Sequence, residues 1–213
     1  MRWTLQYLWL TLKHKVFVFR AGLLTRAPIW RLVIHDWSKF TPSEARHYGR
    51  QFFGDKGDPL GFSYAWLYHQ RRNPHHWEFW IPVTGHTSGG YPDLSPMPMP
   101  EWAVREMIAD WMGASRAYSG KWPESLLGWE WFTKNWYGIA RRMHPQTIKT
   151  VERVMDEVFP SADWEPWGEC LACAGDGMAR HGNSIAGPIC YEVDCPICQR
   201  VGRVTRPKQA AQA

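Results

Sequence analysis

Residues 35–40, HDWSKF, place an imidazole, a carboxylate and an ammonium group at a junction between two expected helices. The first helix opens at Pro28, a residue suited to the first helical turn, and runs through apolar residues to Asp36. The second helix runs toward Phe53, since residues 41–44, Thr-Pro-Ser-Glu, match a capping box with proline in the first turn. The sequence therefore predicts a helical fold in which these polar groups lie at helix ends.

The rest of the chain up to residue 160 also predicts helices and no strand. Its first helix, residues 3–24, repeats apolar side chains at steps of three and four, which is typical of an amphipathic helix whose stripe faces a core. This stripe consists of Leu5, Leu8, Trp9, Leu12, Val16, Phe19 and Leu23. Further helices are expected over residues 63–72, 101–118, 123–143 and 145–158. Residues 1–160 are therefore predicted to form one all-α domain.

Residues 80–100 are expected to form a long loop, because eight Gly and Pro residues interrupt them. Loops of this length in compact domains commonly carry function, and a lid over a site is one candidate role. The 15 tryptophans of the chain are expected mainly to pack in the core. For Trp37 and Trp77, stacking on a base or sugar stays open as an alternative.

Composition bounds the class of protein. The 213 residues are 45% hydrophobic and 21% charged, which is typical of globular chains and excludes a disordered or fibrous protein. The net charge of +5 permits an acidic partner such as nucleic acid without identifying one. No stretch approaches the roughly 18 apolar residues that a membrane-spanning helix needs. We therefore expect a cytoplasmic protein with no membrane partner.

A series of polar residues runs through the helical part of the sequence. Imidazole and carboxylate are the usual ligands of divalent transition metals, and a carboxylate can bridge two of them. The series supplies enough ligands for a dinuclear site, provided that the helices fold inward around it. Glu106 lies one helical turn before the last member and is a candidate second carboxylate or orienting residue. The series is His14, His35, Asp36, His69, His75, His76 and Asp110.

This order of residues resembles the HD-domain superfamily of metal-dependent phosphohydrolases. The stretch HDWSKF is similar to the HDxxK segment of that superfamily, whose lysine often contacts a substrate phosphate; here it is Lys39. The stretches HHWEFW, GGYP and EMIADW loosely resemble elements of its cyclic-dinucleotide phosphodiesterase branch. More closely, about residues 5–155 resemble an uncharacterised family of phage and bacterial proteins. The resemblance implies an HD-like helical bundle.

The same resemblance implies a division of roles. His14, His35, Asp36 and Asp110 would hold one divalent metal, Mn, Fe, Co or Zn, and His69 with His75 or His76 would hold a second. Asp36 is the candidate bridge between the two. Asp36, Lys39 and Glu106 are the expected catalytic residues, and Lys39, Arg71 and Arg72 are expected to bind a substrate phosphate.

The implied activity is hydrolysis of a nucleotide or related phosphate ester. Two close cations lower the pKa of a bridging water and neutralise charge on a phosphoryl oxygen. Relatives on the HD scaffold also include mixed-valent di-iron oxygenases with ligands of the same types, which gives one alternative. The other alternative is a non-catalytic adaptor for nucleic acid or protein.

All five cysteines lie in the last quarter of the chain, and four of them predict a zinc ribbon over residues 165–206 with one structural zinc. Cys190 is left over as a spectator thiol. Basic residues near the cysteines suggest nucleic acid as a further partner of the ribbon, and residues 207–213 are expected to be disordered. The four cysteines form two Cys-x2-Cys pairs: Cys170 with Cys173 and Cys195 with Cys198.

Overall fold

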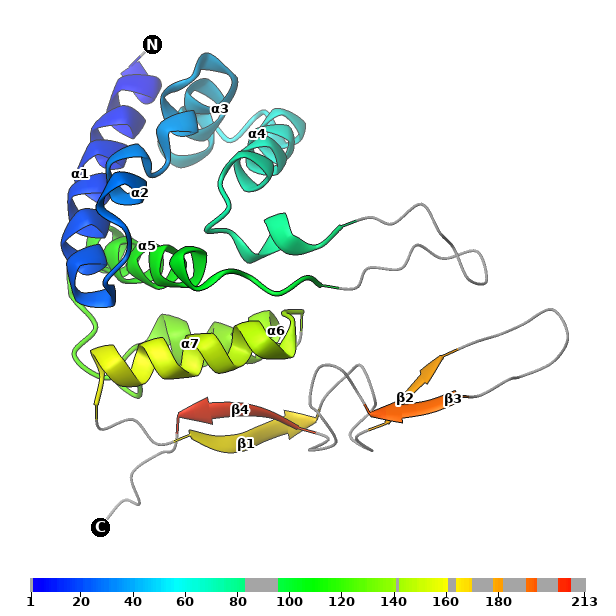
Figure 1. Ribbon diagram of the computed structural model, residues 1–213. Coiled ribbons are helices and arrows are strands. Elements are labelled where there is room, and N and C mark those ends of the chain that lie inside the picture. The colour runs from blue at the N-terminus through cyan, green and yellow to red at the C-terminus, as the bar shows by residue number, and fades with distance from the viewer. Residues whose placement is uncertain are drawn as a thin grey trace, which may run out of the picture. The chain divides into compact units, whose positions relative to one another are not determined.

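The computed structural model describes residues 2–82, 96–140 and 142–160, together with the backbone of four short strands after residue 160. Within residues 2–160, the described parts contain α-helices, two short 3-10 helices and no strand (Figure 1). The prediction of an all-α fold is therefore confirmed for these parts. The α-helices are α1 (Arg2–Thr25), α2 (Ile29–Ile34), α3 (Pro42–Phe53), α4 (Pro59–Arg72), α5 (Glu101–Ser119), α6 (Glu130–Ala140) and α7 (Pro145–Val158).

The chain divides into two compact units. The first consists of Met1–Phe79 and Glu101–Pro123, and the second of Trp80–Pro100 and Glu124–Ala213. The first unit holds α1 to α5 and the 3-10 helices η1 (Trp37–Phe40) and, in its greater part, η2 (Trp77–Trp80). All seven predicted His and Asp metal ligands lie in this first unit.

Helix α1 is the centre of the first unit, where it packs against α5, α3 and α2. The approach to α5 is close, because a Cβ atom at Gly113 would lie 2.7 Å from the backbone nitrogen of Val18. Only a glycine at that position lets the two backbones come this near. The side chains that α1 buries are therefore mostly small or polar: Tyr7, Thr11, His14, Val18, Ala21, Gly22 and Thr25.

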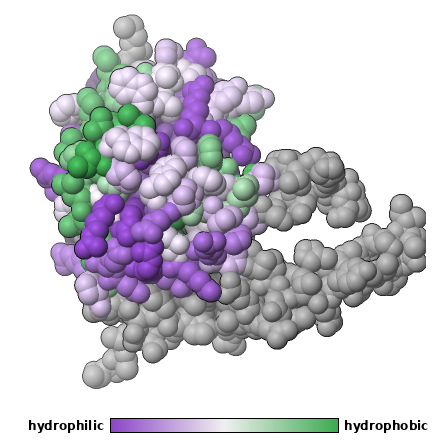
Figure 2. All heavy atoms as spheres, in the orientation of Figure 1, coloured by the Kyte–Doolittle hydropathy of each residue, from purple (hydrophilic) through white to green (hydrophobic). Residues whose placement is uncertain are grey.

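The prediction that the apolar stripe of α1 faces the core is wrong. Leu5 is 64% exposed, Trp9 61% and Leu23 56%, so this stripe lies on the side of the helix opposite the core. The buried stripe follows the same helical period but consists of the residues that fit against α5 and the polar site. In Figure 2, hydrophobic surface gathers over the part of the molecule where Figure 1 shows α1 and α2.

Two helix starts also differ from their predictions. At α3, no capping box forms: Thr41 Oγ1 donates to the Ser38 carbonyl, and the Glu44 side chain turns away from the helix start toward His69. At α4, the helix begins at Pro59, because the Asp58 carboxylate caps it by accepting from a backbone N–H. The predicted helix start at residue 63 was therefore one turn late.

The second unit has an aromatic core. Trp129, Phe132 and Trp136 are almost fully buried and stack in sequence, with ring centroids 5.4 and 5.2 Å apart. Core packing is thus the role of these two tryptophans, as predicted. Helix α6 is shorter than the expected helix over residues 123–143, whereas α7 ends at Val158 as predicted.

Four strands follow residue 160: β1 (Trp164–Glu169), β2 (Met178–His181), β3 (Tyr191–Asp194) and β4 (Arg203–Pro207). β1 pairs antiparallel with β4, and β2 pairs antiparallel with β3. All five cysteines, and with them the predicted zinc ribbon's ligands, lie outside the described residues, as does the tail after residue 207. Residues 83–95 of the expected loop also lie outside them. None of the helices among the described residues meets the length and apolarity that crossing a membrane requires.

Candidate metal centre

The backbone at Asp36 explains how two neighbouring side chains reach the same point. Helix α2 ends at Ile34, His35 is extended, and Asp36 adopts a left-handed conformation with φ 55° before η1 begins. Consecutive side chains of a regular helix diverge, whereas this reversal brings both inward. His35 and Asp36 are 1% and 0% exposed, and His35 Nε2 lies 3.4 Å from Asp36 Oδ2.

The structure brings all seven predicted metal ligands together. They form two groups of four side chains that share Asp36, and in each group the ligand atoms lie within 4.8 Å of one another. These buried clusters could hold metal ions. One group is His14, His35, Asp36 and Asp110, and the other is Asp36, His69, His75 and His76.

The two oxygens of Asp36 divide between the groups. Oδ2 lies 3.5 Å from His14 Nε2 and 3.4 Å from His35 Nε2. Oδ1 lies 3.3 Å from His69 Nε2 and 3.4 Å from His75 Nε2. A carboxylate that presents one oxygen to each of two imidazole sets has the arrangement of a bridging ligand.

Two further carboxylates support the histidines from behind. Glu106 Oε1 lies 3.1 Å from His35 Nδ1 and 3.2 Å from His75 Nδ1, and Glu44 Oε2 lies 3.1 Å from His69 Nδ1. A carboxylate oxygen accepts hydrogen bonds, so Nδ1 of His35 donates to Glu106 and Nδ1 of His69 donates to Glu44, whereas Nδ1 of His75 lies close to Glu106 without a hydrogen bond. A neutral imidazole that donates through Nδ1 keeps its lone pair on Nε2, which is the form that binds a metal.

These inward lone pairs lack a hydrogen-bond donor. Nε2 of His35, His69, His75 and His76 and Oδ1 of Asp36 are buried atoms with no hydrogen-bond partner. Buried polar atoms are nearly always satisfied, and here acceptors face acceptors. Either additional protons or bound cations would resolve this arrangement. The donor set of imidazole nitrogen and carboxylate oxygen fits divalent transition metals.

Charge within the site sets the pKa values of its carboxyl groups. Burial alone would raise the pKa of Asp36, but His35 and Lys39 hold it well below its ordinary value. The pKa of Asp110 is likewise held well below its ordinary value, because the nearby imidazoles of His14 and His35 outweigh burial. Both carboxyl groups are therefore ionised at neutral pH.

The buried histidines shift in opposite directions. Burial would lower the pKa of His35, but Asp36 and Asp110 raise it well above its ordinary value. Burial, together with the neighbouring His75 and His69, lowers the pKa of His76 well below its ordinary value. Burial and His35 also lower the pKa of His75. His75 and His76 are therefore neutral at pH 7, as metal ligands must be.

Lys39 lies beside the shared carboxylate. Its Nζ atom donates to Asp36 Oδ2 at 2.5 Å, and its side chain is 13% exposed. Burial would lower the pKa of Lys39, but Asp36 raises it well above its ordinary value. The predicted phosphate-binding ammonium is thus a charged neighbour of the metal ligands that is paired with Asp36.

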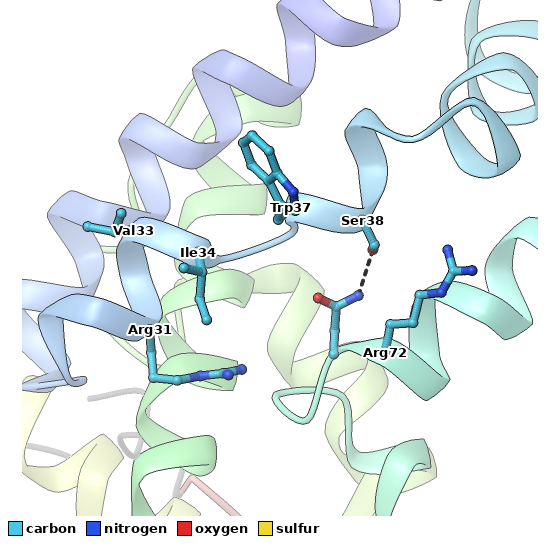
Figure 3. A pocket seen from close by; sticks show the side chains of 7 residues that line it. Arg31, Val33, Ile34, Trp37, Ser38 and Arg72 are labelled. Carbon is cyan, nitrogen blue, oxygen red and sulfur yellow. Dashed lines mark hydrogen bonds between the residues drawn. The ribbon is translucent and has the colours of Figure 1, made fainter.

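A cavity of about 580 Å³ lies between α2, η1 and the end of α4 (Figure 3). Arg31 and Arg72 lie on two sides of it, from α2 and α4 respectively. Asn73 Nδ2 donates to Ser38 Oγ at 2.9 Å, and Ser38 Oγ lies 3.2 Å from His69 Nδ1. The residues lining the cavity are Arg31, Val33, Ile34, Trp37, Ser38, Arg72 and Asn73.

Of the two arginines predicted to bind phosphate, Arg72 lines this cavity, and Arg71 is not among its lining residues. Trp37 is 68% exposed at the cavity rather than packed in the core. Trp77, the other tryptophan for which stacking stayed open, is not among the lining residues.

Four residues of this site were not predicted from the sequence. Arg31 binds Glu106 Oε2 through Nε at 2.7 Å, and Ser38 donates to Glu44 Oε2 at 3.0 Å. Asn73 was expected only as a helix end. Glu44 was interpreted as part of a capping box, and its spacing of three from Thr41 gave no sign of the contact with His69.

Comparison with known proteins supports a family assignment and goes no further. Neither the curated proteins nor the solved structures contain a match to this chain. The model of a family of unknown function, DUF5662, matches residues 4–157. That range covers the whole histidine and carboxylate cluster and most of the chain, so the protein belongs to the DUF5662 family.

Proposed function

We propose that the first unit is a metal-dependent phosphohydrolase of the HD type, acting on a nucleotide or related phosphate ester. The observation that carries this proposal is the arrangement around Asp36: buried Nε2 lone pairs converge on a carboxylate whose two oxygens face different histidine sets. Four-residue groups on each side give each of two cations its own ligands. The HD resemblance of HDWSKF agrees with this assignment.

His14, His35 and Asp110 would hold one cation, and His69, His75 and His76 the other, with Asp36 shared between them. When bound, two divalent cations lower the pKa of a coordinated water and neutralise charge on a phosphoryl oxygen.

The chain's own residues prepare this site before any substrate arrives. Glu106 and Glu44 fix the ring orientation and tautomer of the histidines in front of them. Lys39 compensates part of the negative charge of Asp36. Asp110 is 15% exposed, so its edge of the cluster is open to solvent while Asp36 is closed off.

The cavity between Arg31 and Arg72 is the proposed anchor for an anionic part of the substrate. Each guanidinium has one carboxylate partner, Glu106 or Glu44. A guanidinium has five N–H donors, so one ion pair leaves others for a phosphate. The exposed indole of Trp37 at the same cavity offers a flat surface for a base or sugar.

Metal content tests the shared ligand. We expect His14→Ala and His69→Ala each to lose one ion relative to the wild type, and Asp36→Ala to lose two. His47→Ala is the matched control, because His47 lies in the same unit but pairs with Asp58 away from the cluster. Ions are counted by mass spectrometry as differences from wild type, so that the predicted cysteine-bound zinc cancels. Unchanged metal content in Asp36→Ala would contradict the proposal.

Activity separates this function from its alternatives. Release of phosphate from nucleotides or p-nitrophenyl esters by the Mn- or Co-loaded protein, lost in Asp36→Ala, is the expected result. Oxygen uptake by the iron-loaded protein without phosphate release would favour a di-iron oxygenase instead. A first unit that binds no metal would favour the adaptor.

Separately from the two cations around Asp36, we propose a structural zinc held by Cys170, Cys173, Cys195 and Cys198. Zinc content that falls by one ion in Cys170→Ser, with phosphatase activity retained, is the expected outcome.

A further inference from the structure

The exposed side of α1 carries a regular apolar ridge. Among its members, Leu12 is 46% exposed and Val16 is 52% exposed, and no described residue covers them. The spacing along the ridge alternates strictly between four and three residues. We call it the α1 ridge: Leu5, Trp9, Leu12, Val16, Phe19 and Leu23.

A strict four-three alternation is the pattern of a helix that packs along another helix. It places side chains at the a and d positions of a heptad, which form a seam of knobs that fit between the side chains of a facing helix. A regular apolar stripe on a helix normally packs against another element. The opposite face of α1 packs on α5, whereas the described residues leave the ridge largely exposed.

Helix α2 extends this surface with Ile29 and Trp30, which are each 61% exposed and do not line the cavity. Since α2 packs beside α1, the two helices present one apolar face, and Figure 2 shows hydrophobic surface at this place.

The size of the face matches a stable interface. Eight large apolar side chains, each with roughly half of an area of about 180 Å² exposed, offer on the order of 700 Å². The largest apolar patch of a typical monomer is about 300–600 Å², whereas a standard protein interface uses about 800 Å² from each partner.

We propose that this face is the interface of a homodimer, in which α1 of one copy packs along α1 of a second copy. A second copy presents the same heptad seam and the same area, so the two faces match under a two-fold axis without any further component. Lys15 does not obstruct the seam, because its ammonium turns back to the carbonyls of Val33 and His35.

The charge around the ridge predicts how association of the dimer depends on salt. Residues 1–35 contain six of the 25 Lys and Arg residues and none of the 20 Asp and Glu residues. Exposed Lys13 and Arg20 therefore border a face that meets its own copy. Salt screens this like-charge repulsion, so the homodimer is expected to tighten as salt rises. An anionic bilayer or an acidic partner would show the opposite dependence.

Sedimentation equilibrium of the full chain tests the proposal. The expected mass is about twice 24.9 kDa at micromolar concentration, with tighter association at about 0.5 M salt than at low salt. Leu12→Asp with Val16→Asp should weaken association by about 100-fold, because each buries a charge in the seam. Leu60→Asp is the control, since Leu60 is 67% exposed on α4, outside the face, and should leave the mass unchanged.

Circular dichroism and metal content check that the double variant folds. If the double variant does not fold, Leu5→Lys near the start of α1 is used in its place, and it should weaken association by about 10-fold. A wild type that stays monomeric at about 100 µM would overturn the proposal, as would a dimer that survives both ridge variants. A monomer that instead floats with phosphatidylglycerol vesicles, and is released by salt, would overturn it in favour of a bilayer. All three results are independent of phosphatase activity.

Discussion

Replacement of Glu106 by glutamine tests the role of the carboxylate that lies behind two of the metal-ligating histidines. The Glu106 carboxylate is fully buried and contacts three groups: Arg31 Nε at 2.7 Å, His35 Nδ1 at 3.1 Å and His75 Nδ1 at 3.2 Å. Glutamine has nearly the same shape, but its amide carries no charge and has one oxygen. The variant therefore leaves a partly buried guanidinium and at least one buried imidazole N–H without a carboxylate.

The expected loss of folding free energy follows from the pKa of Glu106. Burial would raise it, but hydrogen bonds from His35 and His75 lower it from 4.5 to about 2. At about 1.4 kcal/mol for each pH unit, this interval corresponds to about 3 kcal/mol of folding free energy. Loss of one partner from a buried ion pair costs about 3–5 kcal/mol, which agrees. We expect the metal-free Glu106→Gln protein to lose about 3 kcal/mol at pH 7.

The sign of the pH dependence is fixed by the same value. A carboxyl group whose pKa is lower in the folded than in the unfolded protein stabilises the fold above the unfolded value. The stabilisation by Glu106 is thus fully present above about pH 4.5 and is lost as the pH falls toward 2. The difference in stability between wild type and Glu106→Gln should therefore shrink as the pH falls below 4.5.

Hydrogen exchange of α5 peptides, followed by mass spectrometry in EDTA, measures this stability in the first unit alone. Glu101→Gln is the control, because Glu101 lies on the same helix and pairs with Arg105 but is half exposed; its loss should stay below about 1 kcal/mol. Metal affinity of Glu106→Gln should also fall about 10- to 100-fold. Equal stability of the two glutamine variants across the pH range would refute the role assigned to Glu106.

Three further predictions follow from single contacts. Gly113→Ala should destabilise the first unit by about 1–3 kcal/mol in urea denaturation, because the new Cβ would lie 2.7 Å from a backbone nitrogen of α1. The control Gly138→Ala, with open space around the new Cβ, should not destabilise the protein. Equal effects of the two substitutions would refute the close approach of α5 to α1. Arg72→Ala should raise KM for a phosphate ester with kcat and metal content nearly unchanged; an unchanged KM would exclude the cavity as the anchor. Lys39→Met removes an ammonium that lowers the pKa of Asp36, so metal retention in a pH titration should fail at higher pH than in wild type; retention to the same pH would contradict this contribution.

The series of metal ligands could be predicted because each lies at or near a helix end or on a helix predicted from the sequence. His35 and Asp36 end α2, His69 lies in the last turn of α4, and His75 follows that helix by three residues. For these side chains to meet, the predicted helices only had to pack with their polar positions facing inward.

The layer behind these ligands could not be predicted in the same way. Glu44 lies three residues after Thr41, and this spacing suits a capping box as well as an inward contact. Which of the two forms depends on the packing of α4, because His69 occupies the space into which Glu44 turns. Arg31 gave no pattern at all, since its partner Glu106 lies 75 residues away.

The orientation of α1 was wrong for a related reason. Its strongest apolar period marks the ridge on the surface, whereas the core face includes Thr11, His14 and Ala21. Close contact with Gly113 selects small side chains there, and the metal site selects a histidine. A hydrophobic pattern identifies faces that avoid water but does not say which partner covers each one.

The left-handed backbone at Asp36 implies a conflict between stability and activity at one position. Residues other than glycine adopt this conformation at a cost of roughly 1 kcal/mol, so a glycine at position 36 would relax the chain. The same glycine would remove the one side chain that belongs to both ligand groups. A stabilisation design that scores backbone strain alone would therefore choose a substitution that erases the site, so engineered stabilisation of the protein should leave this junction untouched.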